Sequence, residues 1–560
     1  MLGTERSAQI EARLAKDAYD TEAWQMLLAE AQNVGTEEQH RDAFDRFLEQ
    51  FPTSGRHWAL YVEFELRHGR TDLAEAIFAR SLREVLSVDL WKSYLAYVQR
   101  NNEHGGNEGR QIVLKAFETA LQYIGMDKDA GGIWSDYIAF IKAGETSSTY
   151  EEQQKMDATR RAYRRVIAIP VMNVEALWRD YDAFENGLSR MTAKKFLAEQ
   201  SPIYMTARTA ARELKQLSEP LQRGSLPCPP RWSDKEMSQL AAWRRYLDWE
   251  KSDPLKIEDA AARYARISFA YKQAMMVLRF YPEVWFQAAS FALEHSRNEE
   301  AIQILKSAID IMPHSFLVNF ALAEIYEERK QVAEARALYE KFLDQLSDDI
   351  AKMNESMTAE IAAFEAQHQR GGNIDGGGGA DMATSSTTDA FGETDGEERE
   401  EARRLRGYTL AAIVMMRFVR RAEGIKVARQ VFSRTRKSPH ITYHLFVASA
   451  LMEYYCSKEA AIAGRVFELG LKSFSDPDYI REYLDYLIRT NDNNNARALF
   501  ERTINMMPAD RAQDVWRLFL DYTCDYEELT NAKEVEKRYL AAYPQGKQGS
   551  MILIIIINGY

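Results

Sequence analysis

Cysteine is scarce in this chain, with only three among 560 residues. Cys228, Cys456 and Cys524 lie far apart, which fits neither a disulfide framework nor a zinc-ligand set and favours a reducing compartment. No apolar run approaches the ~18 residues that a membrane-spanning helix needs. Residues 1–12 are polar and lack the apolar core of a signal peptide. We therefore expect a soluble intracellular protein.

Positive charge is in deficit as well. The chain carries 72 Lys and Arg against 84 Asp and Glu, a net charge of −12. Proteins that bind nucleic acid through a broad surface usually carry an excess of basic residues. The balance therefore speaks against a direct RNA-binding protein, although local basic faces remain open.

Patterns typical of enzymes are absent too. There are hardly any strand patterns and no glycine-rich phosphate loop after a strand. His440 and His444 stand four residues apart, a spacing that bridges a metal on one helix face, but no third ligand lies nearby. We expect no catalytic residues, no metal and no cofactor, and hence no enzyme.

What the chain does contain is a repeated aromatic pattern. Trp58, Tyr61 and Phe64 are spaced three apart, which puts them on one stripe of a helix. A polar turn at Gly69 and a second amphipathic segment follow. Two such helices form an antiparallel pair with too little core to stand alone, so each pair should stack on its neighbours.

This pattern recurs about twelve times, mostly at intervals of 33 to 44 residues. It predicts an all-α fold, an α-solenoid of about twelve antiparallel helix pairs. The aromatic residues are expected to form the core of the repeats rather than platforms for stacking bases, because they recur with helical spacing in each unit. The predicted repeat core consists of Trp58, Tyr61, Phe64, Trp91, Tyr94, Trp134, Tyr137, Trp178, Tyr181, Trp243, Tyr246, Trp249, Trp285 and Trp516.

The solenoid is expected to form two blocks. Residues 1–217 carry five units, and residues 218–234 contain four prolines, which cannot continue a helix. We interpret this segment as the boundary with a second block, 235–545; a long surface loop within one solenoid is the alternative. A Gly-, Ser- and acid-rich insertion at about 346–401 is expected to be disordered, although 348–370 could extend a helix. Residues 546–560 form an atypical apolar tail, which we attribute to an error in the predicted gene rather than to a cap or a β-prone segment.

Several charged residues follow the repeat pattern. Glutamates after the aromatic stripe, such as Glu65 and Glu327, are expected to pair with arginines of the second helix or of a neighbouring unit, such as Arg80 or Arg336. The basic runs at 160–165 and 417–429 fit solvated faces better than a docking patch or an RNA contact. A short basic cluster at 434–437 is a candidate nuclear import signal.

The repeat resembles the HAT (half-a-TPR) motif of RNA-processing scaffolds. Specific stretches at 243–254, 416–426, 450–472, 491–497 and 535–538 narrow the resemblance to the suppressor-of-forked family, the large scaffold subunit of cleavage stimulation factor. The resemblance covers about residues 10–545. It identifies 1–217 as a HAT-N block and 235–545 as a HAT-C block. The insertion at 346–401 departs from the family pattern.

The resemblance implies a nuclear, non-enzymatic scaffold of pre-mRNA cleavage and polyadenylation that dimerises through HAT-C. Implied partners are a second copy, the WD-repeat and RRM subunits of cleavage stimulation factor, and the large cleavage-and-polyadenylation specificity subunit, with RNA bound only indirectly. The family continues into a Pro-rich and helical region that holds the RRM subunit, whereas this sequence stops at Tyr560, so that contact is the least expected. Residues expected at the dimer or partner contact are Arg420, Arg421, Tyr454, Tyr455, Tyr483 and Tyr486.

A HAT scaffold of the spliceosome or of ribosomal RNA processing is the alternative with the same architecture. The stretches at 420–426 and 453–458 speak against it. Neither a direct RNA-binding protein nor an enzyme has a comparable pattern in its favour.

Overall fold

A computed structural model describes residues 2–371 and 386–543; residues 1, 372–385 and 544–560, and with them the predicted apolar tail, lie outside this description. The described residues form 25 α-helices, one π-helical turn and one 3-10 turn, with no β-strand. The predicted all-α fold is confirmed. Within the same residues, no helix combines the length and apolar character needed to cross a bilayer.

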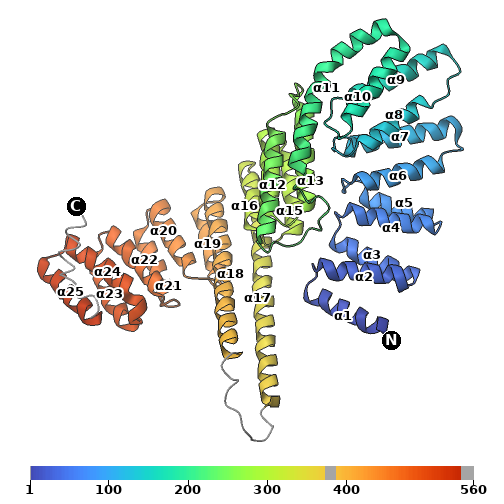
Figure 1. The fold of residues 1–560 in the computed structure, drawn as a ribbon. Coiled ribbons are helices and arrows are strands. Elements are labelled where there is room, and N and C mark those ends of the chain that lie inside the picture. Colours follow the sequence, from blue (N-terminus) through green and yellow to red (C-terminus); the bar gives the residue numbers. More distant parts are fainter. Residues whose placement is uncertain (1, 372–385, 544–560) are drawn as a thin grey trace. The chain divides into compact units, whose positions relative to one another are not determined.

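The chain divides into two compact units, Met1–Met312 and Pro313–Tyr560. In the first unit α1 precedes seven antiparallel helix pairs, which Figure 1 shows stacked from α2 onward. The helices are α1 (Leu2–Lys16), α2 (Thr21–Val34), α3 (Glu37–Gln50), α4 (Gly55–Arg67), α5 (Thr71–Ser81), α6 (Val88–Asn101), α7 (Gly106–Ile124), α8 (Gly131–Lys142), α9 (Thr149–Val166), α10 (Val174–Leu188), α11 (Arg190–Ser218), α12 (Asp234–Lys251), α13 (Ala260–Val277), α14 (Pro282–Glu294) and α15 (Asn298–Ile311).

The second unit holds five more pairs, so the described helices make up the predicted twelve. Its helices and turns are α16 (Phe316–Glu328), α17 (Val332–Gly371), α18 (Ser386–Ala422), α19 (Ile425–Thr435), α20 (His444–Met452), the π-helical η1 (Glu453–Ser457), α21 (Ala460–Leu471), α22 (Pro477–Arg489), α23 (Asn493–Thr503), the 3-10 η2 (Ile504–Met506), α24 (Ala509–Tyr526) and α25 (Leu529–Ala542).

The helix ends follow local sequence signals. Asp20 caps α2 by accepting a hydrogen bond from the Ala23 amide at 3.0 Å. Capping boxes begin α3 at Thr36 and α12 at Ser233, where the side chain of the third helical residue returns a bond to the cap amide. These bonds satisfy amides that have no partner within the helix. Local sequence signals therefore define where these helices begin, independently of how the helices pack.

The proline-rich segment interrupts the helices where expected, because α11 ends at Ser218 and α12 begins at Asp234. The compact unit does not end there. The Thr53 hydroxyl donates to the Met276 carbonyl at 3.0 Å, and the Leu86 amide lies 3.4 Å from the Met276 sulfur. These contacts tie α13 to the loops that precede α4 and α6. The first unit therefore extends to Met312 rather than to residue 217.

The predicted disordered insertion at about 346–401 is helical wherever it is described. Helix α17 continues to Gly371 and α18 starts at Ser386, and Figure 1 shows the two side by side. Leu346 and Ile350 are buried one helical turn apart, and Arg404 of α18 pairs with Asp349 at 3.1 Å. Residues 397–406 are mostly Glu, Arg, Ala and Leu, which favour a helix despite the acidic composition of the segment. The alternative that 348–370 extend a helix is confirmed, the prediction of disorder is wrong for 386–401, and 372–385 lie outside the described residues.

Candidate functional site: repeat cores and a buried polar junction

The predicted repeat-core residues lie inside the helix pairs. Most have at most 7% of their surface exposed, namely Trp58, Tyr61, Trp91, Trp134, Tyr137, Tyr181, Trp243, Tyr246, Trp285 and Trp516. Four are half-buried and pack at the edge of the core, namely Phe64, Tyr94, Trp178 and Trp249. Burial of large aromatic surface is the main favourable term here, and it leaves these rings unavailable for stacking bases.

The tryptophans also fasten the loops between pairs. The indole N–H of Trp58 donates to the Pro52 carbonyl at 2.8 Å, and that of Trp285 donates to the Arg279 carbonyl at 2.9 Å. Trp24 makes the same bond to Ala18, also six residues earlier. A phenylalanine at this position would fill the core but would leave the carbonyl without this donor. The choice of Trp therefore couples core packing to loop position.

A glutamate–arginine pair follows the aromatic stripe in several repeats, and its glutamate is buried in all but the Arg421–Glu327 pair. Glu185 is fully buried and receives hydrogen bonds of 2.6 and 3.1 Å from Arg160. Bidentate geometry of this kind is the strong form of the interaction. The predicted pairing is thus present. The pairs are Arg41–Glu65, Arg160–Glu185, Arg266–Glu250, Arg421–Glu327 and Arg429–Glu453.

The arginines named in advance were wrong. Arg80 pairs with Asp45 at 3.0 Å and covers the Trp58 ring. Arg336 pairs with Glu340 and Glu423. The partners of Glu65, Glu185 and Glu453 instead come from the second helix of the preceding pair. Each of these ion pairs therefore joins two successive repeats.

Several arginines of the two basic runs form such ion pairs. In α9, Arg160 bonds to Glu185 and Arg165 to Glu118 at 2.9 Å. Arg164 lies over the Phe196 ring, and Arg161 is exposed. In the second run, at 417–429, Arg421 and Arg429 hold the glutamates given above. Part of each run thus joins repeats, whereas Arg161 and Arg417 are exposed, as expected for a solvated face.

The residues expected at a dimer or partner contact separate into two groups. Tyr483 and Tyr486 are 4% and 6% exposed and pack on the Phe467 ring, so their prediction as surface contacts was wrong. Both occupy apolar-stripe positions of α22, which is why they turn inward. The others remain accessible: Arg420 and Tyr454 are half-buried, Arg421 is exposed although paired with Glu327, and Tyr455 is 57% exposed in the π-helical turn η1.

The candidate metal-binding pair is not joined by further ligands in the described part of the chain. The Nδ1 atom of His444 lies 3.0 Å from the Thr442 hydroxyl, and burial lowers the pKa of His444. The described residues contain no group of three or more His, Cys, Asp and Glu placed to hold a metal ion. The three cysteines are free.

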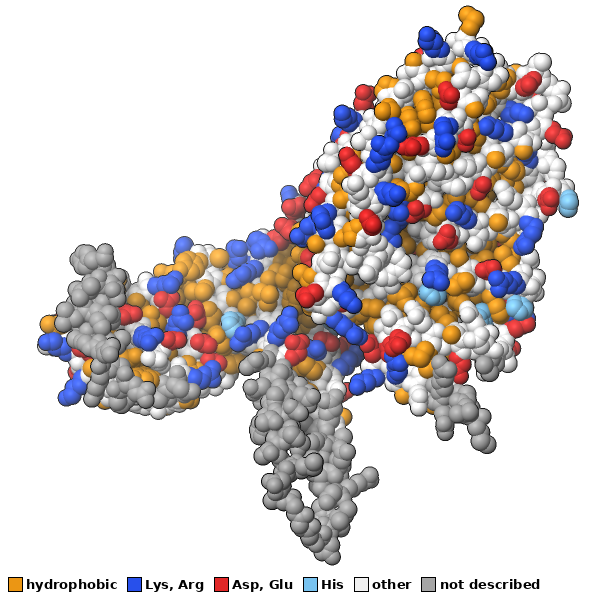
Figure 2. All heavy atoms as spheres, in the orientation of Figure 1, with side chains coloured by type: hydrophobic (Ala, Val, Ile, Leu, Met, Phe, Trp, Pro, Cys, Tyr) orange, Lys and Arg blue, Asp and Glu red, His pale blue; other side chains and the backbone are white. Residues whose placement is uncertain are grey.

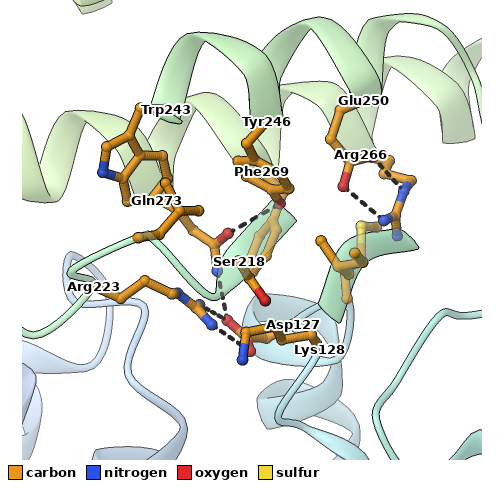
Figure 3. A pocket seen from close by; sticks show the side chains of 13 residues that line it. Asp127, Lys128, Ser218, Arg223, Trp243, Tyr246, Glu250, Arg266, Phe269 and Gln273 are labelled. Atoms are coloured by element: carbon orange, nitrogen blue, oxygen red, sulfur yellow. Dashed lines mark hydrogen bonds and ion pairs between the residues drawn. The ribbon is translucent and has the colours of Figure 1, made fainter. Parts of the chain in front are cut away.

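A buried polar cluster lies within the first unit, where α12 and α13 pack on the loop after α7 (Figure 3). Asp127 of that loop is almost fully buried and forms an ion pair with Arg223 of the proline-rich segment. The Gln273 amide of α13 also donates to Asp127, and the Tyr246 hydroxyl of α12 lies 3.5 Å from the Gln273 carbonyl oxygen. Three segments distant in sequence thus meet at one carboxylate. We call this cluster the polar junction.

The electrostatics of the polar junction fit a structural clamp. Burial opposes the charged form of Arg223, but the Asp127 and Asp129 carboxylates together outweigh this effect and raise the pKa of Arg223. Nearby, burial raises the pKa of Glu250, and the bidentate Arg266 guanidinium opposes the rise (Figure 3). The groups satisfy one another and leave little space between them. The sequence carried no signal for Asp127 and Arg223, because both lie in loops outside the repeat pattern.

One face of the molecule shows mixed charge. On the face drawn in Figure 2, Lys and Arg side chains alternate with Asp and Glu side chains, and apolar patches lie between them. A surface of this kind suits many separate protein contacts better than one continuous polyanion.

Comparison with known proteins gives concordant matches. The family described as suppressor of forked protein (Suf) matches residues 5–555. The mRNA 3′-end-processing protein rna14 of Schizosaccharomyces pombe is 34% identical, over 97% of this chain and 72% of its own length. The corresponding protein of Cryptococcus neoformans is 38% identical, over 88% and 49%. Protein suppressor of forked of Drosophila melanogaster is 33% identical, over 98% and 70%. The chain thus spans between half and three quarters of these relatives.

Among solved structures, the crystal structure of CstF-77 matches with a TM-score of 0.55, covering 88% of this chain and 89% of that one. Its sequence identity is 18%, so this likeness speaks to the fold alone. That fold agrees with the helical solenoid described above.

Proposed function

The chain belongs to the suppressor of forked family, and we propose that it is a non-enzymatic scaffold of pre-mRNA 3′-end cleavage and polyadenylation. The observation that carries the proposal is the family match across residues 5–555, joined to relatives named as mRNA 3′-end-processing proteins. A solenoid fits the role, because it presents a large surface for its length. The mixed surface charge favours protein partners over direct binding of RNA.

We further propose that the chain dimerises through its second unit. Tyr455, Tyr454 and Arg420 are the candidate contact residues that remain accessible there. Two copies would place two sets of docking surfaces in one particle, which raises the avidity of weak contacts. Light scattering tests this directly: a dimer has about twice the 64.4 kDa mass of the chain, and a monomer at micromolar concentration overturns the proposal.

The proposed location is the nucleus. Arg434, Arg436 and Lys437 are exposed at the end of α19, where an import receptor would reach them, although Arg434 also pairs with Glu340 at 3.0 Å. Loss of nuclear accumulation in the Arg436→Ala/Lys437→Ala variant would support this cluster as the signal. Unchanged nuclear accumulation of this variant would rule out the cluster as the import signal.

The function itself is tested by affinity purification from nuclear extract with identification of the co-purifying proteins. We expect a WD-repeat subunit and the large cleavage-and-polyadenylation specificity subunit, and the presence or absence of an RRM subunit shows whether this chain makes that contact. Recovery of spliceosomal or nucleolar proteins in place of 3′-end factors would overturn the proposal.

A further inference from the structure

A cleft of about 620 Å³ lies within the first unit, on the side of α13 that faces the loops of earlier repeats. One wall is a single face of α13, including Tyr264, Ser268 and Met275, which recur at helical spacing. The other wall is built from the loops after α3 and α5 and the end of α7, where Tyr123 and Met126 lie. The cleft therefore runs along a rigid helix and is closed by loops from several repeats.

Part of the lining is apolar and adaptable. Met126, Met275 and Met276 contribute thioethers, and Tyr123 and Phe269 contribute half-buried rings. Methionine-rich surfaces accommodate differently shaped side chains, because the side chain is flexible and polarisable. A large apolar side chain of a ligand would therefore find a matching environment here.

The charge of the cleft is positive, in contrast to the chain as a whole. Arg83, Lys272 and Arg279 line it, and the structure gives none of the three an ion pair with a described carboxylate. Glu84 lies on the same rim and offsets part of the Arg279 charge. Two further charged residues offset each other: Arg297 lies over the Tyr264 ring and 3.9 Å from Glu300, which accepts a 2.8 Å bond from the Tyr264 hydroxyl.

Among these cations, Arg279 gives the strongest argument for a ligand that carries a carboxylate. Its side chain is half-buried, and burial lowers its pKa, because removal from water disfavours the charged form. Its position is set by the backbone, since the Arg279 carbonyl accepts the Trp285 indole bond at 2.9 Å. A guanidinium kept out of water without an ion pair gains more from an incoming carboxylate than a solvated one would.

We propose that this cleft docks an acidic peptide segment of a partner protein, one that carries carboxylates beside a large apolar side chain. The carboxylates would meet Arg83, Lys272 and Arg279, and the apolar side chain would enter the methionine-lined part. RNA fits less well, because three cations without an ion pair, with Glu84 beside them, are few for a polyphosphate backbone on a chain of net charge −12. This inference depends on the proposed scaffold function in one respect only, namely that the ligand belongs to a partner protein.

The test uses the purified full chain and a displayed library of random 12-residue peptides. We expect selected sequences rich in Asp and Glu with at least one aromatic or large aliphatic residue. A selected peptide, labelled with fluorescein, should bind the Arg83→Ser/Lys272→Ser/Arg279→Ser variant about tenfold or more weakly by anisotropy. The matched control Arg161→Ser/Arg244→Ser/Arg245→Ser removes three exposed cations elsewhere in the first unit and should leave the affinity unchanged.

Several results would overturn the proposal. These are selected peptides that are basic or neutral, equal losses in the two triple variants, or no loss in either. Tight binding of a labelled 12-nucleotide oligouridine that the first triple variant abolishes would assign the cleft to RNA instead. If circular dichroism shows that this triple variant is unfolded, the single exposed change Lys272→Glu carries the test, with the same expected loss.

The two proposals fail separately. Peptide binding is measured with purified components, so absence of processing factors from nuclear extract would remove the proposed function and leave the cleft assignment standing. Conversely, a cleft that binds no acidic peptide would leave the scaffold function intact.

Discussion

The contacts within the two compact units differ in how many residues separate the partners in the sequence. In the first unit, Thr53 bonds to Met276, 223 residues later, and Gln273 bonds to Asp127 across 146 residues. In the second unit, ion pairs between successive repeats span far less. Arg429–Glu453 spans 24 residues, Arg502–Glu468 spans 34, and Arg538–Glu501 spans 37. The Arg421–Glu327 pair spans 94 residues only because the long helices α17 and α18 intervene.

From this difference we expect that one repeat pattern can give two kinds of stability. A stack in which each pair contacts only its neighbours gains stability repeat by repeat and can open from its ends. A stack whose early loops are also bound by a later helix must release that helix before those repeats open. We therefore expect the first unit to unfold more cooperatively than the second.

The strongest test removes one core tryptophan from each unit. Trp134→Ala and Trp516→Ala should each lower the free energy of unfolding by about 3–5 kcal/mol, because both side chains are buried. Hydrogen–deuterium exchange should rise throughout the first unit for Trp134→Ala, but only in α22 to α25 for Trp516→Ala. Exchange confined to α6–α9 in the Trp134→Ala variant would contradict the comparison.

The next test removes the clamp itself. Arg223→Ala leaves the nearly buried Asp127 carboxylate without its cation and should cost about 3 kcal/mol. Exchange should rise in α12, α13 and the loop after α7, with the second unit unchanged. Arg231→Ala is the control, because Arg231 pairs with Asp17 while 72% exposed and should cost less than about 1 kcal/mol.

A smaller effect is expected for a pair that joins two neighbours in the second unit. Glu453 is buried, and its hydrogen bonds from Arg429 lower its pKa. Arg429→Ala should cost about 2 kcal/mol, since Arg429 itself is 40% exposed, and should loosen only α19 to α21. Adding Glu453→Gln should recover part of the loss. Loosening that extends through α25 would mean that the second unit is cooperative after all.

The smallest effect is a difference in acid sensitivity. Burial lowers the pKa of His57 in the first unit to about 4, and its Nδ1 atom lies 2.7 Å from the Ser54 hydroxyl. Because the folded pKa lies below the unfolded value, the unfolded chain takes up the proton first. This contribution to stability is therefore complete above about pH 6.5 and is lost as the pH falls toward 4.

We expect a loss of about 1–2 kcal/mol from this partly buried ring. His57→Gln should flatten the pH dependence of the first unit's thermal midpoint, and His444→Gln, which removes a ring with a lowered pKa, should act on the second unit alone. An unchanged slope in the His57→Gln variant would rule out this origin of acid sensitivity.

Much of the fold could be predicted because its repeats are local. The three-residue spacing of Trp58, Tyr61 and Phe64 defines a helix face, and its recurrence defines the pairs. The same rule would have placed Tyr483 and Tyr486 correctly, since both stand on the apolar stripe of α22. Their prediction as surface contacts came from the family resemblance and not from their spacing.

The polar junction and the cleft could not be predicted in the same way. Asp127 and Arg223 are 96 residues apart in two loops, and nothing in the spacing of either predicts the other. The cleft depends on which loops α13 reaches after the proline-rich segment turns the chain. Contacts of this kind depend on the path of the chain through the whole unit. The periodic spacing of apolar residues reports only local helix faces and cannot predict them.

The long closure between Thr53 and Met276 also bears on how the protein is made. A ribosome adds about 5–20 residues per second, so the first loops wait roughly 10–45 s before α13 has been synthesised. During that interval the first repeats can fold as helix pairs, while the surface that α13 later covers stays open to water and to other nascent chains. We therefore expect the N-terminal repeats to benefit from protection by chaperones during translation.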